Sequence, residues 1–158
     1  MKILTPQERA YLAGFLDADG SLFAQIVRGK DYAYHFRIRL SIGFYQNKKY
    51  SWFFTNLQKD LKCGSLRQKK DDVMEYVITA DDPVKNLLLQ IKDDLILKKR
   101  QAHLILEILE KKKTIQSKSD FLALCQLTDQ VALLNYSKKR TITAEEVAKV
   151  LFPPDGME

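Results

Sequence analysis

Cysteines, low-complexity segments and long apolar runs are scarce or absent in this chain, and each absence excludes a class of protein. The only cysteines are Cys63 and Cys125, which fit no metal-ligand spacing and which we interpret as reduced thiols, not as a disulfide framework. No apolar run is long enough to span a bilayer, so we expect no membrane segment. Pro6, Glu8 and Arg9 interrupt any apolar signal-peptide region, and we therefore expect an intracellular protein.

The sequence also lacks a linker, because no stretch rich in proline, glycine and serine divides its 158 residues. A chain of this length can bury one substantial hydrophobic core. We therefore predict a single domain over residues 1–152 and a mobile tail over residues 153–158. The net charge of +6 favours a polyanionic partner such as a nucleic acid.

The most informative stretch is residues 12–20, Leu-Ala-Gly-Phe-Leu-Asp-Ala-Asp-Gly. A helix should lead into it, because Thr5 and Glu8 can form a capping box and Pro6 suits the first helical position. The helix should end in a turn, because aspartate and glycine tolerate turn geometry. The stretch therefore predicts a helix that ends in two carboxylates.

Gly14 and Ala18 are four residues apart and share one face of this predicted helix. Both residues are small, which lets a second helix approach this face closely. If two copies of the helix pack there, their two Asp19 carboxylates lie side by side at the shared end. Adjacent carboxylates repel each other unless a divalent cation lies with them, so the pattern predicts a metal site.

Two ordinary interpretations compete with this one. A glycine-rich helix end with two aspartates is often only a C-terminal turn. The spacing Asp-x-Asp-Gly is also found in calcium-binding loops, but Gly20 at the sixth loop position would place Phe15 first and Ile26 last. Neither of those side chains can bind calcium, which excludes the calcium-loop interpretation.

Residues 11–25, Tyr-Leu-Ala-Gly-Phe-Leu-Asp-Ala-Asp-Gly-Ser-Leu-Phe-Ala-Gln, closely resemble the signature of the LAGLIDADG homing endonucleases. The resemblance implies a site-specific endonuclease of intron homing that hydrolyses phosphodiester bonds in double-stranded DNA. Only one copy of the motif is present, which in this family implies a homodimer and a long, near-palindromic target. The resemblance also implies Mg²⁺ as the cofactor, with Mn²⁺ able to substitute, and a chloroplast, mitochondrial or prokaryotic cytoplasmic location.

The order of predicted elements agrees with this resemblance. The patterns predict helix, two strands, helix, two strands and then helices, which is the α+β arrangement αββαββα with additional C-terminal helices. Four antiparallel strands should form a curved sheet with one face left open for a ligand. Trp52 and Leu97 are expected in the core. The expected strands are 21–28, 33–46, 65–69 and 73–79, and the expected later helices are 48–61, 83–92, 95–112, 121–135 and 144–151.

The resemblance implies roles for particular residues. Asp19 and the carbonyl of Ala18 should bind the metal, while Gln46 and Lys98 should surround the nucleophilic water. Without the motif, Lys98 would be interpreted as a solvated cation at a helix start. We assign Asp17 to structure, either holding the turn or pairing across the dimer interface. That interface is expected to include Leu12, Ala13, Gly14 and Asp17.

The alternating strand 33–46 places its arginines on the face opposite to its large apolar side chains. Arginine can pair with guanine, glutamine with adenine, and glutamate can accept from cytosine in the major groove. An ordinary solvated sheet face is the alternative interpretation. The residues that we expect to contact DNA are Gln25, Arg37, Arg39, Arg67, Lys69 and Glu75.

Two other functions remain open from the sequence. One is a non-cleaving relative, either an RNA maturase that assists intron splicing or a DNA-binding regulator. The other is an unrelated basic structural protein. The set of Asp19, Gln46 and Lys98 favours cleavage, because a protein that only binds nucleic acid does not need it.

Overall fold

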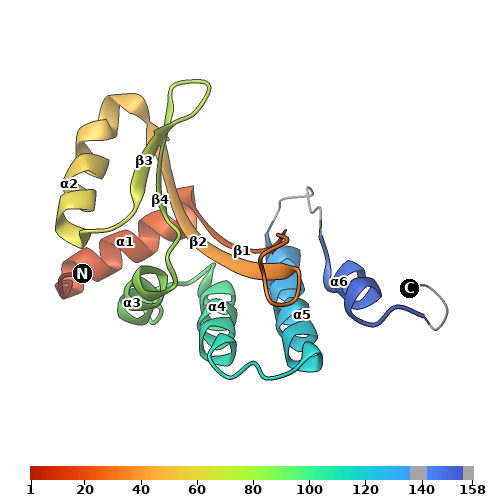
Figure 1. Cartoon of the computed structure of the whole chain (residues 1–158). Coiled ribbons are helices and arrows are strands. Elements are labelled where there is room, and N and C mark those ends of the chain that lie inside the picture. The colour runs from red at the N-terminus through yellow and green to blue at the C-terminus, as the bar shows by residue number, and fades with distance from the viewer. Residues whose placement is uncertain (136–141, 155–158) are drawn as a thin grey trace. The chain divides into compact units, whose positions relative to one another are not determined.

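The computed structural model describes residues 1–135 and 142–154 of the chain (Figure 1). Its elements follow the predicted order, with small differences at their ends. They are α1 (Pro6–Asp19), β1 (Gly20–Arg28), β2 (Phe36–Asn47), the 3-10 helix η1 (Lys48–Tyr50), α2 (Ser51–Leu61), β3 (Ser65–Gln68), β4 (Val73–Ile78), α3 (Asp81–Ile91), α4 (Lys99–Lys112), α5 (Lys118–Leu134) and α6 (Ala144–Leu151).

The four strands form one sheet in the order β1-β2-β4-β3, and the pairs β2–β4 and β3–β4 are antiparallel. The predicted α+β fold is confirmed. On β2, the buried residues Phe36, Ile38 and Leu40 alternate with the exposed Arg37 and Arg39. The alternation gives the sheet one apolar face and one polar face, and the polar face is open along these residues.

Helix α1 begins as its sequence predicts. The Thr5 hydroxyl accepts from the Glu8 backbone N–H, and the Glu8 side chain accepts from the Thr5 N–H at 2.8 Å, which completes the capping box. Leu12 and Ala13 lie on the buried face of the helix. Both were predicted at the dimer interface, but their side chains are already enclosed in the core of this chain. Their place at the dimer interface stays a prediction.

Two side chains that were predicted in the core are exposed instead. Trp52 is 62% exposed, because α2 buries Phe54 and Leu57 and a residue two positions before Phe54 points away from that face. Leu97 is 73% exposed, because α4 begins at Lys99 and not at Leu95 as predicted. Leu97 therefore lies in the turn before the helix, where the helical pattern does not apply.

The chain divides into two compact units, and β1 and β2 each run from one unit into the other. The first unit holds residues 1–23 and 40–103, including α1 to α3, β3 and β4. The second holds residues 24–39 and 104–158, where α5 and α6 pack together and the Asp129 carboxylate accepts from the backbone N–H of Ala144 at 3.1 Å. The single domain over residues 1–152 stays a prediction, and residues 155–158 of the predicted mobile tail lie outside the described residues. Within the described residues, no helix is long and apolar enough to cross a membrane.

Candidate active site and nucleic-acid interface

Asp19 is the last residue of α1, and its carboxylate is exposed. It lines a hollow of about 690 Å³ together with Gly14 and Gln46. Within residues 1–135 and 142–154, its carboxylate has no hydrogen-bond or ion-pair partner. An exposed carboxylate with free oxygens can bind a cation, so the structure leaves Asp19 available for the predicted role.

Asp17 has its oxygens fully engaged in the fold. Its carboxylate accepts from the backbone N–H groups of Ile96, Leu97 and Lys98 at 2.7, 3.1 and 2.9 Å. The Lys98 ammonium in turn donates to the Asp17 carbonyl at 2.5 Å. These bonds anchor the turn before α4 to the last turn of α1 and hold Lys98 close to the helix end that carries Asp19.

We expect Asp17→Asn to lower both stability and the activity that depends on Lys98. The amide keeps one acceptor oxygen where the carboxylate used two, so at least one backbone N–H loses a charge-assisted bond, at a cost of about 1–3 kcal/mol. Thermal unfolding should show a lower midpoint, and Asp31→Asn, an exposed loop carboxylate, serves as the matched control. An unchanged melting temperature would show that these bonds do not hold the turn.

Gln46 lies near the end of β2, and its side-chain oxygen accepts from the Asn47 backbone N–H at 2.9 Å. Gln46 and Asp19 together line two surface hollows, the one of about 690 Å³ and another of about 410 Å³. The oxygen atoms of Asp19, of the Ala18 carbonyl and of a water held by Gln46 are ligands that suit Mg²⁺. Among the described residues, no group of three or more His, Cys, Asp and Glu side chains could hold a metal, so an ion at Asp19 would also need oxygen ligands of other kinds, such as a backbone carbonyl or water.

In the second unit, three of the predicted DNA-contacting residues lie on the open face of β1 and β2. The Arg39 guanidinium donates to the Gln25 side-chain oxygen at 2.8 Å, which joins the two side chains across the strands. The Arg37 guanidinium lies 4.9 Å from the centre of the Tyr32 ring. Both arginines are therefore held in place and remain exposed.

In the first unit, Arg67 and Lys69 are exposed, but Glu75 is only 7% exposed. The strand register pairs Glu75 with Tyr45 on one side and with Arg67 on the other. The Lys69 ammonium lies 3.4 Å from the Glu75 carboxylate, and the Tyr45 phenol is also close to it. Glu75 therefore lies on the predicted face with its carboxylate covered by neighbouring side chains.

The sequence analysis missed Tyr45 as a residue of this face. The alternation that placed Arg37 and Arg39 outward also places Tyr45 outward, six residues after Arg39. Burial and the nearby Glu75 carboxylate raise the pKa of the Tyr45 phenol to about 12, so the phenol stays protonated at neutral pH.

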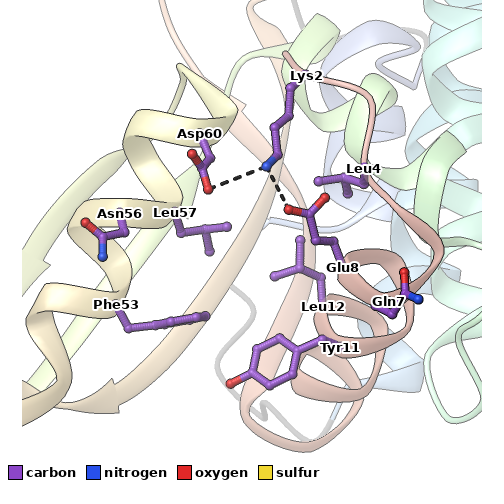
Figure 2. Close-up of a pocket in the computed structure, with 10 residues that line it drawn as sticks. All are labelled: Lys2, Leu4, Gln7, Glu8, Tyr11, Leu12, Phe53, Asn56, Leu57 and Asp60. Carbon is purple, nitrogen blue, oxygen red and sulfur yellow. Dashed lines mark hydrogen bonds and ion pairs between the residues drawn. The ribbon is translucent and has the colours of Figure 1, made fainter.

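Exposed apolar side chains surround the small face of α1. Gly14 is exposed, and a Cβ added there would meet nothing within 4 Å in this chain. Tyr11, which is 60% exposed, lies beside it and also lines another hollow of about 380 Å³ between α1 and α2 (Figure 2). Phe53 and Leu57 form the wall of that hollow on α2, and Lys2 crosses it to the carboxylates of Glu8 at 2.7 Å and Asp60 at 3.6 Å.

Both the sequence and the fold of this chain match known proteins. A sequence model described as LAGLIDADG endonuclease matches residues 12–103. The chain is 36% identical to the DNA endonuclease I-CvuI of Chlorella vulgaris over 142 residues, which cover 90% of this chain and 88% of that protein. It is 37% identical to the DNA endonuclease I-CreI of Chlamydomonas reinhardtii over 142 residues, which cover 89% of this chain and 86% of that protein.

The solved structure of I-CvuI in complex with its target in 2 mM Ca has a TM-score of 0.85 to this chain, at 35% identity and with 92% of both chains covered. A second I-CvuI structure, in complex with an I-CreI target in 2 mM Mg and with the same TM-score, contains DNA that is not cleaved.

Proposed function

This chain belongs to the LAGLIDADG endonuclease family, and on that premise we propose that it is a magnesium-dependent homing endonuclease that cuts a near-palindromic DNA target as a homodimer. The observation that carries the proposal is the contrast between the two carboxylates of the motif. Asp17 is bonded to the fold, whereas Asp19 is exposed and free at the end of α1. A protein that only binds nucleic acid has no use for a free carboxylate at that place.

The residues of this chain would divide the chemistry of phosphodiester hydrolysis between them. A divalent ion held by Asp19 and the Ala18 carbonyl would polarise the phosphate and make its bound water more acidic. Gln46, an amide that both donates and accepts, would orient the attacking water. The Lys98 ammonium would stabilise the negative charge that develops as the bond from phosphorus to the leaving oxygen breaks.

The choice of metal rests on ligand chemistry. The candidate ligands are oxygen atoms, which suit Mg²⁺ and Mn²⁺ better than softer transition metals. Calcium prefers more ligands at longer distances, so it should support DNA binding but position the water poorly. The crystal structures of the relative I-CvuI were obtained with Mg and with Ca, which fits a divalent-ion site in the family.

The homodimer would form through the exposed face of α1. Ala10, Gly14 and Ala18 lie at spacings of four residues and are all exposed. The exposed Tyr11 and Trp52 flank this small face and add apolar surface that a second copy would cover. A two-fold axis through α1 would bring the two Asp19 carboxylates together and present the same open sheet face twice, which accounts for a near-palindromic target.

The effect of replacing Arg39 on DNA affinity should show whether its guanidinium contacts a base or a phosphate. We expect Arg39→Ala to weaken specific binding by about 1–3 kcal/mol if the guanidinium contacts a base. If it contacts only a phosphate, the slope of log affinity against log salt should fall by about one unit instead. Gel-shift titrations at several salt concentrations, with Arg100→Ala on the exposed side of α4 as control, separate these results. No change in either quantity would show that this face does not contact DNA.

The proposed function can be tested by a selection that itself identifies the target. A library of randomised duplexes would be incubated with the protein and Mg²⁺ well above 2 mM, the concentration at which the DNA in the I-CvuI crystal stayed uncut. We expect cut duplexes that share one near-palindromic sequence and that disappear in excess chelator. Cutting without sequence preference, or cutting in chelator, would contradict the proposal.

A further inference from the structure

Tyr45 lies along the open face of β2, with its ring above Gly43. A Cβ added to Gly43 would lie 2.8 Å from the phenol oxygen and 3.1 Å from the adjacent ring carbon of Tyr45. The ring therefore occupies the space of a side chain at position 43. At this place on the face, one aromatic ring stands where two outward side chains would otherwise lie.

The hydroxyl of Tyr45 lies against the chain, over Gly43. Burial and then the nearby Glu75 carboxylate raise the pKa of this hydroxyl, and the Ser21 side chain lowers it, so both residues lie close to it. The Lys69 ammonium lies 5.6 Å from the ring centre and 3.4 Å from the same carboxylate. The hydroxyl is thus turned towards Gly43 and its neighbours, and the carbon surface of the half-buried ring is what remains for a base.

The same contacts close off Glu75. The Lys69 ammonium lies 3.4 Å from its carboxylate, the Tyr45 phenol is close to it, and the residue is only 7% exposed. We predicted that Glu75 could accept a hydrogen bond from the amino group of cytosine, and in our proposal the Tyr45 ring keeps its carboxylate from the base edge. Removing the Tyr45 ring would uncover it.

Among the four bases, only thymine presents a methyl group in the major groove, and apolar side chains recognise it by contact. We propose that Tyr45 is a specificity-determining residue that reads a thymine through its C5-methyl group and keeps Glu75 from reading a cytosine at the same place. This inference rests on the proposed function, since it requires the open sheet face to lie against DNA.

The structure also indicates where in the target this thymine lies. Tyr45 lines a hollow of about 410 Å³ together with Asp19 and Gln46. The base pair that Tyr45 meets should therefore be close to the phosphate that is cut, and not at the outer end of the half-site.

The test is a binding selection from randomised duplexes in Ca²⁺, carried out with wild type, Tyr45→Phe, Tyr45→Ala and the double variant Tyr45→Ala/Glu75→Gln. Wild type should select thymine at one position near the centre of each half-site. Tyr45→Phe keeps the ring and should keep that preference. Tyr45→Ala should shift the preference towards cytosine, because it uncovers Glu75, and the double variant should have no preference there.

Deoxyuridine lacks the methyl group and tests the contact directly. Replacing the selected thymine by deoxyuridine should weaken wild-type binding about fourfold, the value of one buried methyl-sized group, and should leave Tyr45→Ala unaffected. An unchanged base preference in Tyr45→Ala, with the fold intact by circular dichroism, would overturn the role of Tyr45 while leaving the proposed function standing. Equal wild-type affinity for the thymine and deoxyuridine duplexes would also overturn the role of Tyr45 and leave the proposed function standing. A wild-type protein that selects no duplex would overturn both.

Discussion

Asp19→Asn should reduce DNA cleavage about a thousandfold or more while leaving specific DNA binding nearly unchanged. The carboxylate is exposed and unpartnered within the described residues, so the substitution removes a cation ligand without breaking a bond of the fold. Metal activation of a phosphate and its attacking water is worth several kcal/mol, and each factor of ten in rate corresponds to about 1.4 kcal/mol. Single-turnover cleavage and gel-shift titration, done on the same preparation, measure the two quantities separately.

Asp31→Asn is a suitable control for Asp19→Asn, because it removes one negative charge from an exposed loop. The control should cleave at the wild-type rate, and the thermal unfolding of Asp19→Asn should match that of wild type. If Asp19→Asn cleaved normally, the metal site would have to lie elsewhere. If it lost binding and cleavage together, Asp19 would contribute to DNA contact and not to catalysis.

Gly14→Leu is expected to have the second large effect, through loss of the dimer. Nothing in this chain lies within 4 Å of a Cβ at position 14, so the chain itself does not require glycine there. Overpacking costs roughly 1–3 kcal/mol per added side chain, and a two-fold axis through α1 would impose that cost twice. The dimer dissociation constant should therefore rise at least about thirtyfold, as measured by analytical ultracentrifugation, and cleavage should fall with it.

Ala123→Leu on the exposed side of α5 controls for the added apolar surface. It should leave the dimer and the cleavage rate unchanged. At protein concentrations low enough for wild type to be monomeric as well, Gly14→Leu should have the same melting temperature as wild type. A Gly14→Leu protein that remains dimeric would show that α1 does not lie on the two-fold axis.

Local signals predicted most of the fold. The capping box of Thr5 and Glu8 and the alternation on β2 each depend on residues that are near one another in the sequence. Such patterns constrain backbone geometry directly, which is why the elements were expected in their correct order. The turn predicted at the end of the first helix was wrong, because Gly20 is extended and β1 begins there directly after Asp19. The fold itself followed from the resemblance of residues 11–25 to one family.

The errors occurred where a residue's surroundings come from distant parts of the chain. Asp17 binds the turn before α4, about 80 residues away, and with that turn held by Asp17 the helix begins at Lys99 instead of Leu95. Glu75 was expected to face solvent because its strand position does, but Tyr45 and Lys69 cover it. Sequence periodicity gives the direction of a side chain but not what lies above it.

Trp52 shows a further limit. An exposed tryptophan is uncommon, and its large apolar surface led to the prediction that it was in the core. Its position beside Gly14 in the same hollow agrees with a surface that a second copy would cover. Periodicity within one chain cannot separate a core residue from one that is buried only in the dimer.

The central claim is that each copy supplies one Asp19 and that two copies cut the two strands, and mixed dimers test it most directly. Wild-type and Asp19→Asn chains carrying different affinity tags would be expressed together and purified through both tags. Incubated with Mg²⁺ and a supercoiled plasmid carrying the selected target, the mixed dimer should yield nicked circles, while wild type yields linear DNA. Linear product from the mixed dimer at the wild-type rate would contradict the account, because one Asp19 would then suffice for both strands.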